Sequence, residues 1–155
     1  MSGRMIAQCI MVLVSGLTLS EGIAASAELM PLDPVPAPYA DKHMPAGWWT
    51  DPKVIEEGKK IYVGEADPLV SCTGCHGEDG EPVRSGEGVR SLKNTKRFSD
   101  SYWYWRVAEG IPKTPMMPWK SLLSEDQIWQ VVAFMHTFSH GGKPVEHKDF
   151  TGYKR

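Results

Sequence analysis

The feature that most constrains this chain is the run Cys72-Thr73-Gly74-Cys75-His76. Two thiols three positions apart in a helical turn can each add to one vinyl group of a porphyrin, and the adjacent histidine is then placed to bind the iron. This Cys-x-x-Cys-His spacing is the attachment pattern of c-type haem. The run therefore predicts a domain folded around one covalently attached haem c, with Cys72 and Cys75 as the attachment residues and His76 as an axial iron ligand.

Two other uses of a closely spaced cysteine pair fit the sequence less well. A zinc site would need a fourth ligand beside these three side chains, and the chain has no second paired cluster. A thioredoxin-like redox pair would need a surrounding βαβ pattern, which the sequence lacks. Six tryptophans and eight methionines among 155 residues suit a domain wrapped around a large apolar group.

The first 27 residues have the pattern of an export signal. Arg4 is followed by a largely apolar run from Met5 to Leu19, and Ala25-Ser26-Ala27 offers the small-x-small pattern that signal peptidase reads. The apolar run is shorter than the roughly 20 residues needed to span a bilayer. We therefore expect residues 1–27 to be a cleaved signal peptide and the protein to be periplasmic, with an uncleaved membrane anchor as the alternative.

The rest of the chain is predicted to divide into three parts. Residues 28–50 contain five prolines, which fix the backbone and remove hydrogen-bond donors, so they indicate an extended linker or strap. Residues 51–140 are expected to form the haem domain, with loops at 77–94 and 111–119, and residues 141–155 to form a polar C-terminal tail. No β-strand pattern stands out, so the fold class is expected to be all-α.

Capping residues predict the first two long helices of the domain. Asp51 followed by proline suits an N-cap with proline at the first helical position, and apolar residues then recur at helical spacing over 52–63. Ser99 or Asp100 can begin a second helix, which we expect to run to about Glu109, where glycine and proline follow.

A third helix is predicted near the C-terminus. Ser124 and Gln127 form a capping-box pattern, and apolar residues then follow one face as far as Phe138. His136 and His140 lie four positions apart on this helix, and we expect both at the protein surface.

A second axial ligand is expected in the proline-rich loop before the last helix. This loop contains Met116 and Met117. A thioether from either residue could reach the iron on the face opposite His76, where His/Met ligation favours the reduced metal. Methionines that only fill the core are the alternative.

From about Asp51 to Phe138 the chain resembles the class I c-type cytochromes, in which a few helices and a Met loop close around one haem. The resemblance rests on the haem motif, the helix order and the loop. It implies a small class I cytochrome c fold of three to four helices around one covalently attached haem, here with a Pro-rich N-terminal strap. It also implies that Gly58 meets an aromatic residue of the last helix, with Phe134 as the candidate, and it makes Tyr62 a candidate for haem packing.

The stretch from Glu109 to Met116 is similar to the family's G-I-P-x-T-x-M form of the ligand loop. This similarity implies that Met116 binds the iron, with Met117 as the alternative, and that Trp119 packs near the haem edge. One departure concerns the second shell, because many members carry a proline whose carbonyl accepts the Nδ1 proton of the ligand histidine. Here Pro82 comes early in the following loop, so another acceptor is expected for the histidine.

These features together predict electron transfer rather than an enzyme. The expected partners are redox proteins. The protein itself would be either a diffusing shuttle or the cytochrome subunit of a larger membrane or periplasmic respiratory oxidoreductase. A formal net charge of −2 does not indicate nucleic-acid binding. The alternative is a haem enzyme or gas sensor with an open sixth coordination site, which would require that neither methionine binds iron.

Overall fold

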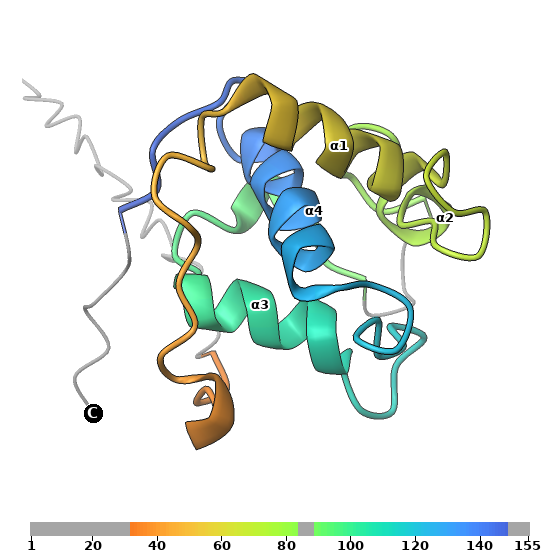
Figure 1. Cartoon of the computed structure of the whole chain (residues 1–155). Coiled ribbons are helices and arrows are strands. Elements are labelled where there is room, and N and C mark those ends of the chain that lie inside the picture. Colours follow the sequence, from red (N-terminus) through yellow and green to blue (C-terminus); the bar gives the residue numbers. More distant parts are fainter. Residues whose placement is uncertain (1–31, 84–88, 149–155) are drawn as a thin grey trace, which may run out of the picture. The chain divides into compact units, whose positions relative to one another are not determined.

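The structure is a computed structural model that describes residues 32–83 and 89–148 (Figure 1). The expected signal peptide, residues 1–27, lies outside the described residues. Residues 1–32 and 33–155 separate into two units, and the second contains all the helices of the described residues. Within the described residues, no helix is both long enough and apolar enough to cross a membrane.

The described part of the chain is helical and contains no strand, as the sequence predicts. The three long helices bury one core, and the shorter helices lie in the connections between them. In chain order the elements are η1 (Ala37–Tyr39), α1 (Pro52–Val63), α2 (Thr73–His76), η2 (Leu92–Asn94), α3 (Asp100–Glu109) and α4 (Glu125–Phe138).

The predicted caps set the ends of the long helices. The Asp51 carboxylate accepts hydrogen bonds from the first backbone amides of α1, which ends at Gly64 in the left-handed region with φ of 83°. Ser99 is the residue that caps α3, by accepting from the Tyr102 amide. At α4 both hydrogen bonds of the Ser124 capping box are present. The helix bounds predicted from the sequence are therefore confirmed.

Two sequence expectations are wrong. The segment 77–94, expected to be loop throughout, contains the single 3-10 turn η2, which the Ser91 side chain caps and which buries Leu92. His136, expected at the surface, is only 1% exposed. The reason is non-local, because Trp49 and the C-terminal segment cover it.

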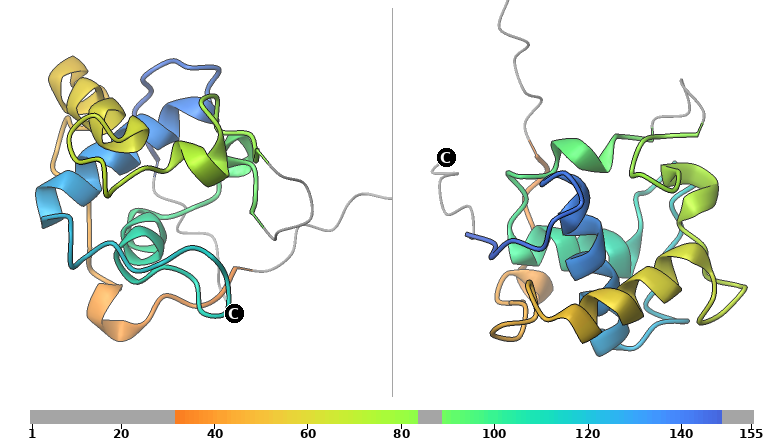
Figure 2. Two further views of the ribbon diagram at one scale, coloured as in Figure 1. Left: turned by 90° about the vertical axis from the view of Figure 1, so that its right-hand side faces the viewer. Right: turned by 90° about the horizontal axis from the view of Figure 1, so that it is seen from above.

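The main contact of the domain is the crossing of α1 with α4, which lie side by side in Figures 1 and 2. A Cβ atom added to Gly58 would lie 1.9 Å from the carbonyl oxygen of Gln130 and 3.1 Å from Cβ of Phe134. The close crossing that the sequence predicts at Gly58 is confirmed, with the Gln130 backbone as the nearest neighbour. Only a residue without a side chain lets the two helix axes approach this closely.

The proline-rich segment is bound along α3 as a strap (Figure 1). The Ser101 hydroxyl donates to the carbonyl oxygens of Ala40 and Lys42, at 2.8 and 3.1 Å, and the Met44 amide donates to the Asp100 carboxylate at 2.9 Å. Two side-chain pairs add to these contacts, namely Tyr39 with Glu109 and Arg106 with Asp33.

The Gly58 contact generates the first prediction. Gly58→Ala would force α1 and α4 apart, because the added methyl group meets backbone rather than a flexible side chain. We expect the free energy of unfolding of the haem-loaded protein to fall by about 1–3 kcal/mol, measured by denaturant unfolding followed by circular dichroism. The matched control is Lys59→Ala, at an exposed position of the same helix. Equal unfolding midpoints for the two variants would contradict the close crossing.

Candidate haem site

Helix α2 is a single turn that brings the haem-motif side chains together at one edge of the domain (Figure 1). The backbone amides of Cys75 and His76 both donate to the Cys72 carbonyl, at 3.2 and 2.9 Å, and the Cys72 amide donates to the Tyr62 carbonyl of α1 at 2.9 Å. Both cysteines are free thiols, Cys72 half-buried and Cys75 exposed. The turn thus holds two thiols and an imidazole in the order that haem attachment requires.

The Cys72 thiol does not have the character of a reactive or zinc-binding cysteine. Burial, and then the neighbouring Cys75, raise the pKa of the Cys72 thiol to about 12. Cysteines that bind metals or react as nucleophiles instead have lowered pKa values, since the thiolate is the active form. Among the residues that the structure describes, no three His, Cys, Asp or Glu side chains form a group that could hold a metal ion.

His76 is half-buried, and its ring favours the neutral form. Burial lowers the pKa of this imidazole, and the nearby backbone of Arg90 partly offsets that shift. The Nδ1 atom is buried, and no group in the described residues meets it in hydrogen-bonding geometry. A neutral imidazole is the form that binds a metal, and its other nitrogen then needs an acceptor.

Tyr62 anchors the end of the haem-motif turn from inside the core. Its hydroxyl donates to the Gly77 carbonyl at 2.6 Å, directly after His76. Its ring packs against Phe134 and Phe138 of α4, with centroid distances of 5.2 and 5.4 Å. Burial raises the pKa of Tyr62 far above its usual range. The structure therefore places Tyr62 beside the haem-motif turn, as a hydrogen-bond donor as well as a packing residue.

The Met loop is closed by its own backbone. The Ile111 amide donates to the Met116 carbonyl at 2.9 Å. Gly110 has φ of 64°, and a Cβ atom there would lie 2.3 Å from the same carbonyl oxygen, so this position requires glycine. The side chain of Met116 is half-buried, whereas Met117 is 49% exposed.

Two tryptophans belong to the core or pack against it. Trp119 is half-buried against the core, and its amide donates to the Val107 carbonyl of α3 at 3.3 Å. Trp103 is 3% exposed, and its Nε1 atom is buried with no partner among the described residues. Trp103 does not stand out in the sequence, because it belongs to an aromatic run, Tyr102 to Trp105, that core packing explains equally well.

These observations fit a haem group. Buried polar atoms in native proteins normally have partners, so the orphaned Nδ1 of His76 and Nε1 of Trp103 call for an explanation. A covalent haem offers one for each, because iron ligation orients the histidine ring and the haem propionates are acceptors. The donor set of two thiols, an imidazole and a thioether is also the one that c-type haem uses.

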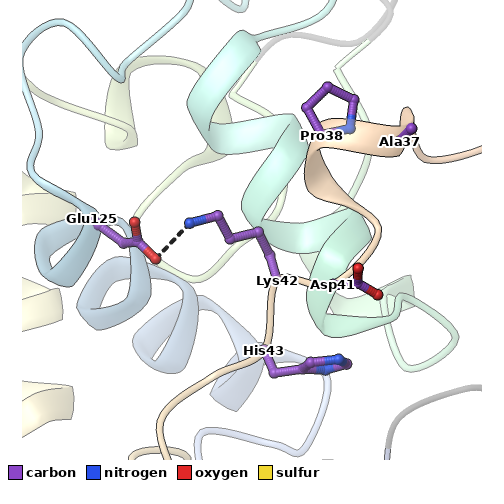
Figure 3. A pocket seen from close by; sticks show the side chains of 6 residues that line it. All are labelled: Ala37, Pro38, Asp41, Lys42, His43 and Glu125. Atoms are coloured by element: carbon purple, nitrogen blue, oxygen red, sulfur yellow. Dashed lines mark hydrogen bonds and ion pairs between the residues drawn. The ribbon is translucent and has the colours of Figure 1, made fainter.

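The hollow drawn in Figure 3 is a separate feature. It is lined by Ala37, Pro38, Asp41, Lys42, His43 and Glu125. An ion pair of 2.7 Å between Lys42 and Glu125 crosses it, from the strap to the start of α4. None of the haem-site candidates lines this hollow.

The Tyr62 hydrogen bond generates the second prediction. Tyr62→Phe keeps the ring and removes the donor to the buried Gly77 carbonyl, so we expect the free energy of unfolding to fall by about 1 kcal/mol. Tyr104→Phe is the matched control, because the Tyr104 hydroxyl makes no hydrogen bond to the described residues but its ring is also buried. Denaturant midpoints of both variants check this, and a loss no larger at Tyr62 than at Tyr104 would contradict the anchoring role.

Comparisons with known proteins identify the family of this chain. The family model "Cytochrome C oxidase, cbb3-type, subunit III" matches residues 53–135. No curated protein matches the sequence.

Three solved structures that are similar to this chain are cytochromes. One is the KustC0563 c-type cytochrome, with 30% identity and a TM-score of 0.45, over 52% of this chain and 95% of that chain. Cytochrome cL from Methylophaga aminisulfidivorans has 22% identity and a TM-score of 0.43, over 58% of this chain and 56% of that one. Cytochrome cL from Hyphomicrobium denitrificans has 25% identity and a TM-score of 0.42, over 57% and 49%. The chain thus spans about half the length of each cytochrome cL. Because the family model covers more than half of the sequence, the chain belongs to this family of c-type cytochromes, which bind covalent haem c.

Proposed function

We propose that this cytochrome transfers single electrons through one haem, which Cys72 and Cys75 attach and which His76 and Met116 bind as axial ligands. The observation that carries the proposal is the α2 turn, which presents two free thiols and the adjacent imidazole together. The bound haem supplies a reversible one-electron iron couple. The surrounding residues hold the ligands in place in both oxidation states.

The choice of Met116 over Met117 rests on the loop. The side chain of Met116 is half-buried and its carbonyl closes the loop, while the side chain of Met117 extends to an exposed position. A thioether fixed in this way keeps the sixth position filled, which disfavours binding of substrates or gases at the iron.

The Arg90 backbone replaces the missing loop proline in this proposal. Its carbonyl is the group near the His76 ring. It accepts the Nδ1 proton once iron ligation has oriented the ring, and so raises the basicity of the ligand. Pro82, the only proline between the haem motif and Pro112, lies next to Val83, whose amide donates to the Cys75 carbonyl at 3.1 Å.

Redox partners would dock where the turn and the Met loop reach the surface. Exposed apolar side chains lie near both in the sequence: Leu69, Val83, Met117 and Leu122 are 73, 60, 49 and 41% exposed. Such side chains allow close, desolvated contact with a partner. The cytochrome accordingly serves as an electron carrier between proteins.

The expected organisation of the chain is part of the same proposal. Residues 1–27 direct export to the periplasm, residues 28–50 form the strap, residues 51–140 hold the haem and residues 141–155 form the tail. The strap and tail exceed what a minimal shuttle needs, which favours a lasting place in a larger oxidoreductase. Size-exclusion chromatography of a native periplasmic extract checks this: we expect the haem to elute with a larger complex, and elution at the monomer position would support the free shuttle.

The ligand assignment generates a further prediction. Met116→Ala should leave haem covalently attached but abolish the Met-to-iron charge-transfer absorption of the ferric protein. Met117→Ala is the matched control and should retain that absorption. Optical spectra of the two purified variants, with haem staining of denatured gels, make the measurement.

Other outcomes would change the proposal in defined ways. If the absorption survives in Met116→Ala and disappears in Met117→Ala, Met117 is the ligand. If the unmodified protein lacks it and binds carbon monoxide readily when reduced, the sixth position is open and the function is that of a haem enzyme or gas sensor.

A further inference from the structure

Three histidines converge at the C-terminal end of α4. The ring of His136 lies 4.5 Å from that of His140 and 5.0 Å from that of His147, between centroids. The Nε2 atom of His136 is 3.2 Å from Nδ1 of His147, which is hydrogen-bonding distance. His136 lies in the last turn of α4, His140 in the turn directly after the helix, and His147 in the segment that follows, so the cluster joins this segment to the domain.

The ring of Trp49 completes the cluster. Its centroid is 4.6 Å from that of His136 and 4.8 Å from that of His147. His136 is consequently 1% exposed, and its Nδ1 atom has no hydrogen-bond partner among the described residues. A second proton on this ring would be placed at an atom with neither water nor an acceptor beside it.

The segment after α4, residues 143–148, is fixed to the domain at two further points. The Thr50 hydroxyl donates to the Glu146 carboxylate at 2.8 Å. The Nε2 atom of His147 lies 3.6 Å from a carboxylate oxygen of Asp100, at the start of α3. The side chain of His147 is only 3% exposed, so the segment covers the cluster rather than trailing from it.

We propose that residues 143–148 form a pH-sensitive clasp, which is closed on Trp49 and His136 while His136 is neutral and opens when His136 takes up a proton in mildly acidic solution. Opening lifts His147 away from His136 and lets water reach the ring.

Some of the charged groups around the cluster favour added positive charge there, and others disfavour it. Asp100 and Glu146 are acidic: Asp100 lies beside His147, and Glu146 lines a surface hollow that His136, His140 and His147 also line. Lys96 and Lys148 border the same surface hollow and disfavour added positive charge. His43, on the strap, lies 3.9 Å from Asp100 and competes for that carboxylate when protonated.

His136 decides the balance, because its buried Nδ1 atom has no hydrogen-bond acceptor among the described residues. Burial, then His147 and His140, lower the pKa of His136 to about 3. Once the clasp is open, the ring regains an ordinary pKa of about 6.5. Above pH 6.5 both forms are neutral at this ring and the clasp keeps its full stability. Between pH 6.5 and 3 the open form binds one more proton, so each unit of falling pH shifts the equilibrium about tenfold towards opening.

The test is an NMR titration of the reduced, haem-loaded, full-length chain from pH 7.5 to 4.5. Backbone 15N heteronuclear NOEs report order on the picosecond-to-nanosecond timescale. We expect the amides of residues 145–148 to be as ordered as those of α1 at pH 7.5. As the pH falls to 4.5, the ratio of open to closed clasp should rise about a hundredfold, and only the clasp amides should lose order.

Two variants assign the effect to His136. His136→Phe keeps a ring against Trp49 but cannot take up a proton, so residues 145–148 should stay ordered at pH 4.5. Glu57→Gln removes a titratable side chain that pairs with Lys60 on α1, outside the cluster, and should respond as the unmodified chain does.

Three results would overturn the proposal: clasp amides that stay ordered at pH 4.5 in the unmodified chain, loss of order in α1 at the same pH, or an unchanged response in His136→Phe. The first two come from the unmodified chain, so they decide the matter even if His136→Phe fails to fold.

Discussion

The close approach of α1 to α4 at Gly58 is the contact on which the rest of the domain depends. It brings the Gln130 carbonyl to where a side chain would stand on α1, and one helical turn later it sets Tyr62 between Phe134 and Phe138. From there the Tyr62 hydroxyl reaches the Gly77 carbonyl, and the Tyr62 carbonyl binds the Cys72 amide. Both ends of the haem-motif turn are therefore tied to one residue of the crossing. Helix packing and cofactor geometry are coupled in this domain.

Local signals in the sequence were sufficient for the helices. The Asp51, Ser99 and Ser124 caps each act within three residues of their own position, so the helix starts could be predicted without knowledge of the fold. The haem motif could be predicted for the same reason, since its chemistry is contained in five consecutive residues. Gly58 required the family resemblance as well, because its partner lies more than seventy positions away in the sequence.

What the sequence could not show depends on contacts between distant segments. The position of His136 on α4 suited a surface, but the cover over it comes from Trp49 and from residues beyond the helix. The Arg90 backbone lies near His76 because of the way the intervening loop folds. Every residue has the same backbone groups, so the sequence does not indicate which of them comes close to the histidine. The orphaned indole nitrogen of Trp103 likewise became visible only when the burial of every atom was known.

In the Met loop, the shape of the backbone does not depend on the side chain that the loop offers as a ligand. Its shape depends on the backbone, through the Ile111 amide, the Met116 carbonyl and the left-handed glycine at 110. None of these groups belongs to the side chain of residue 116. The chemical identity of the side chain offered from this loop can therefore change without a change in the fold of the loop, whereas any residue larger than glycine at 110 would displace the main chain whatever side chain stood at 116.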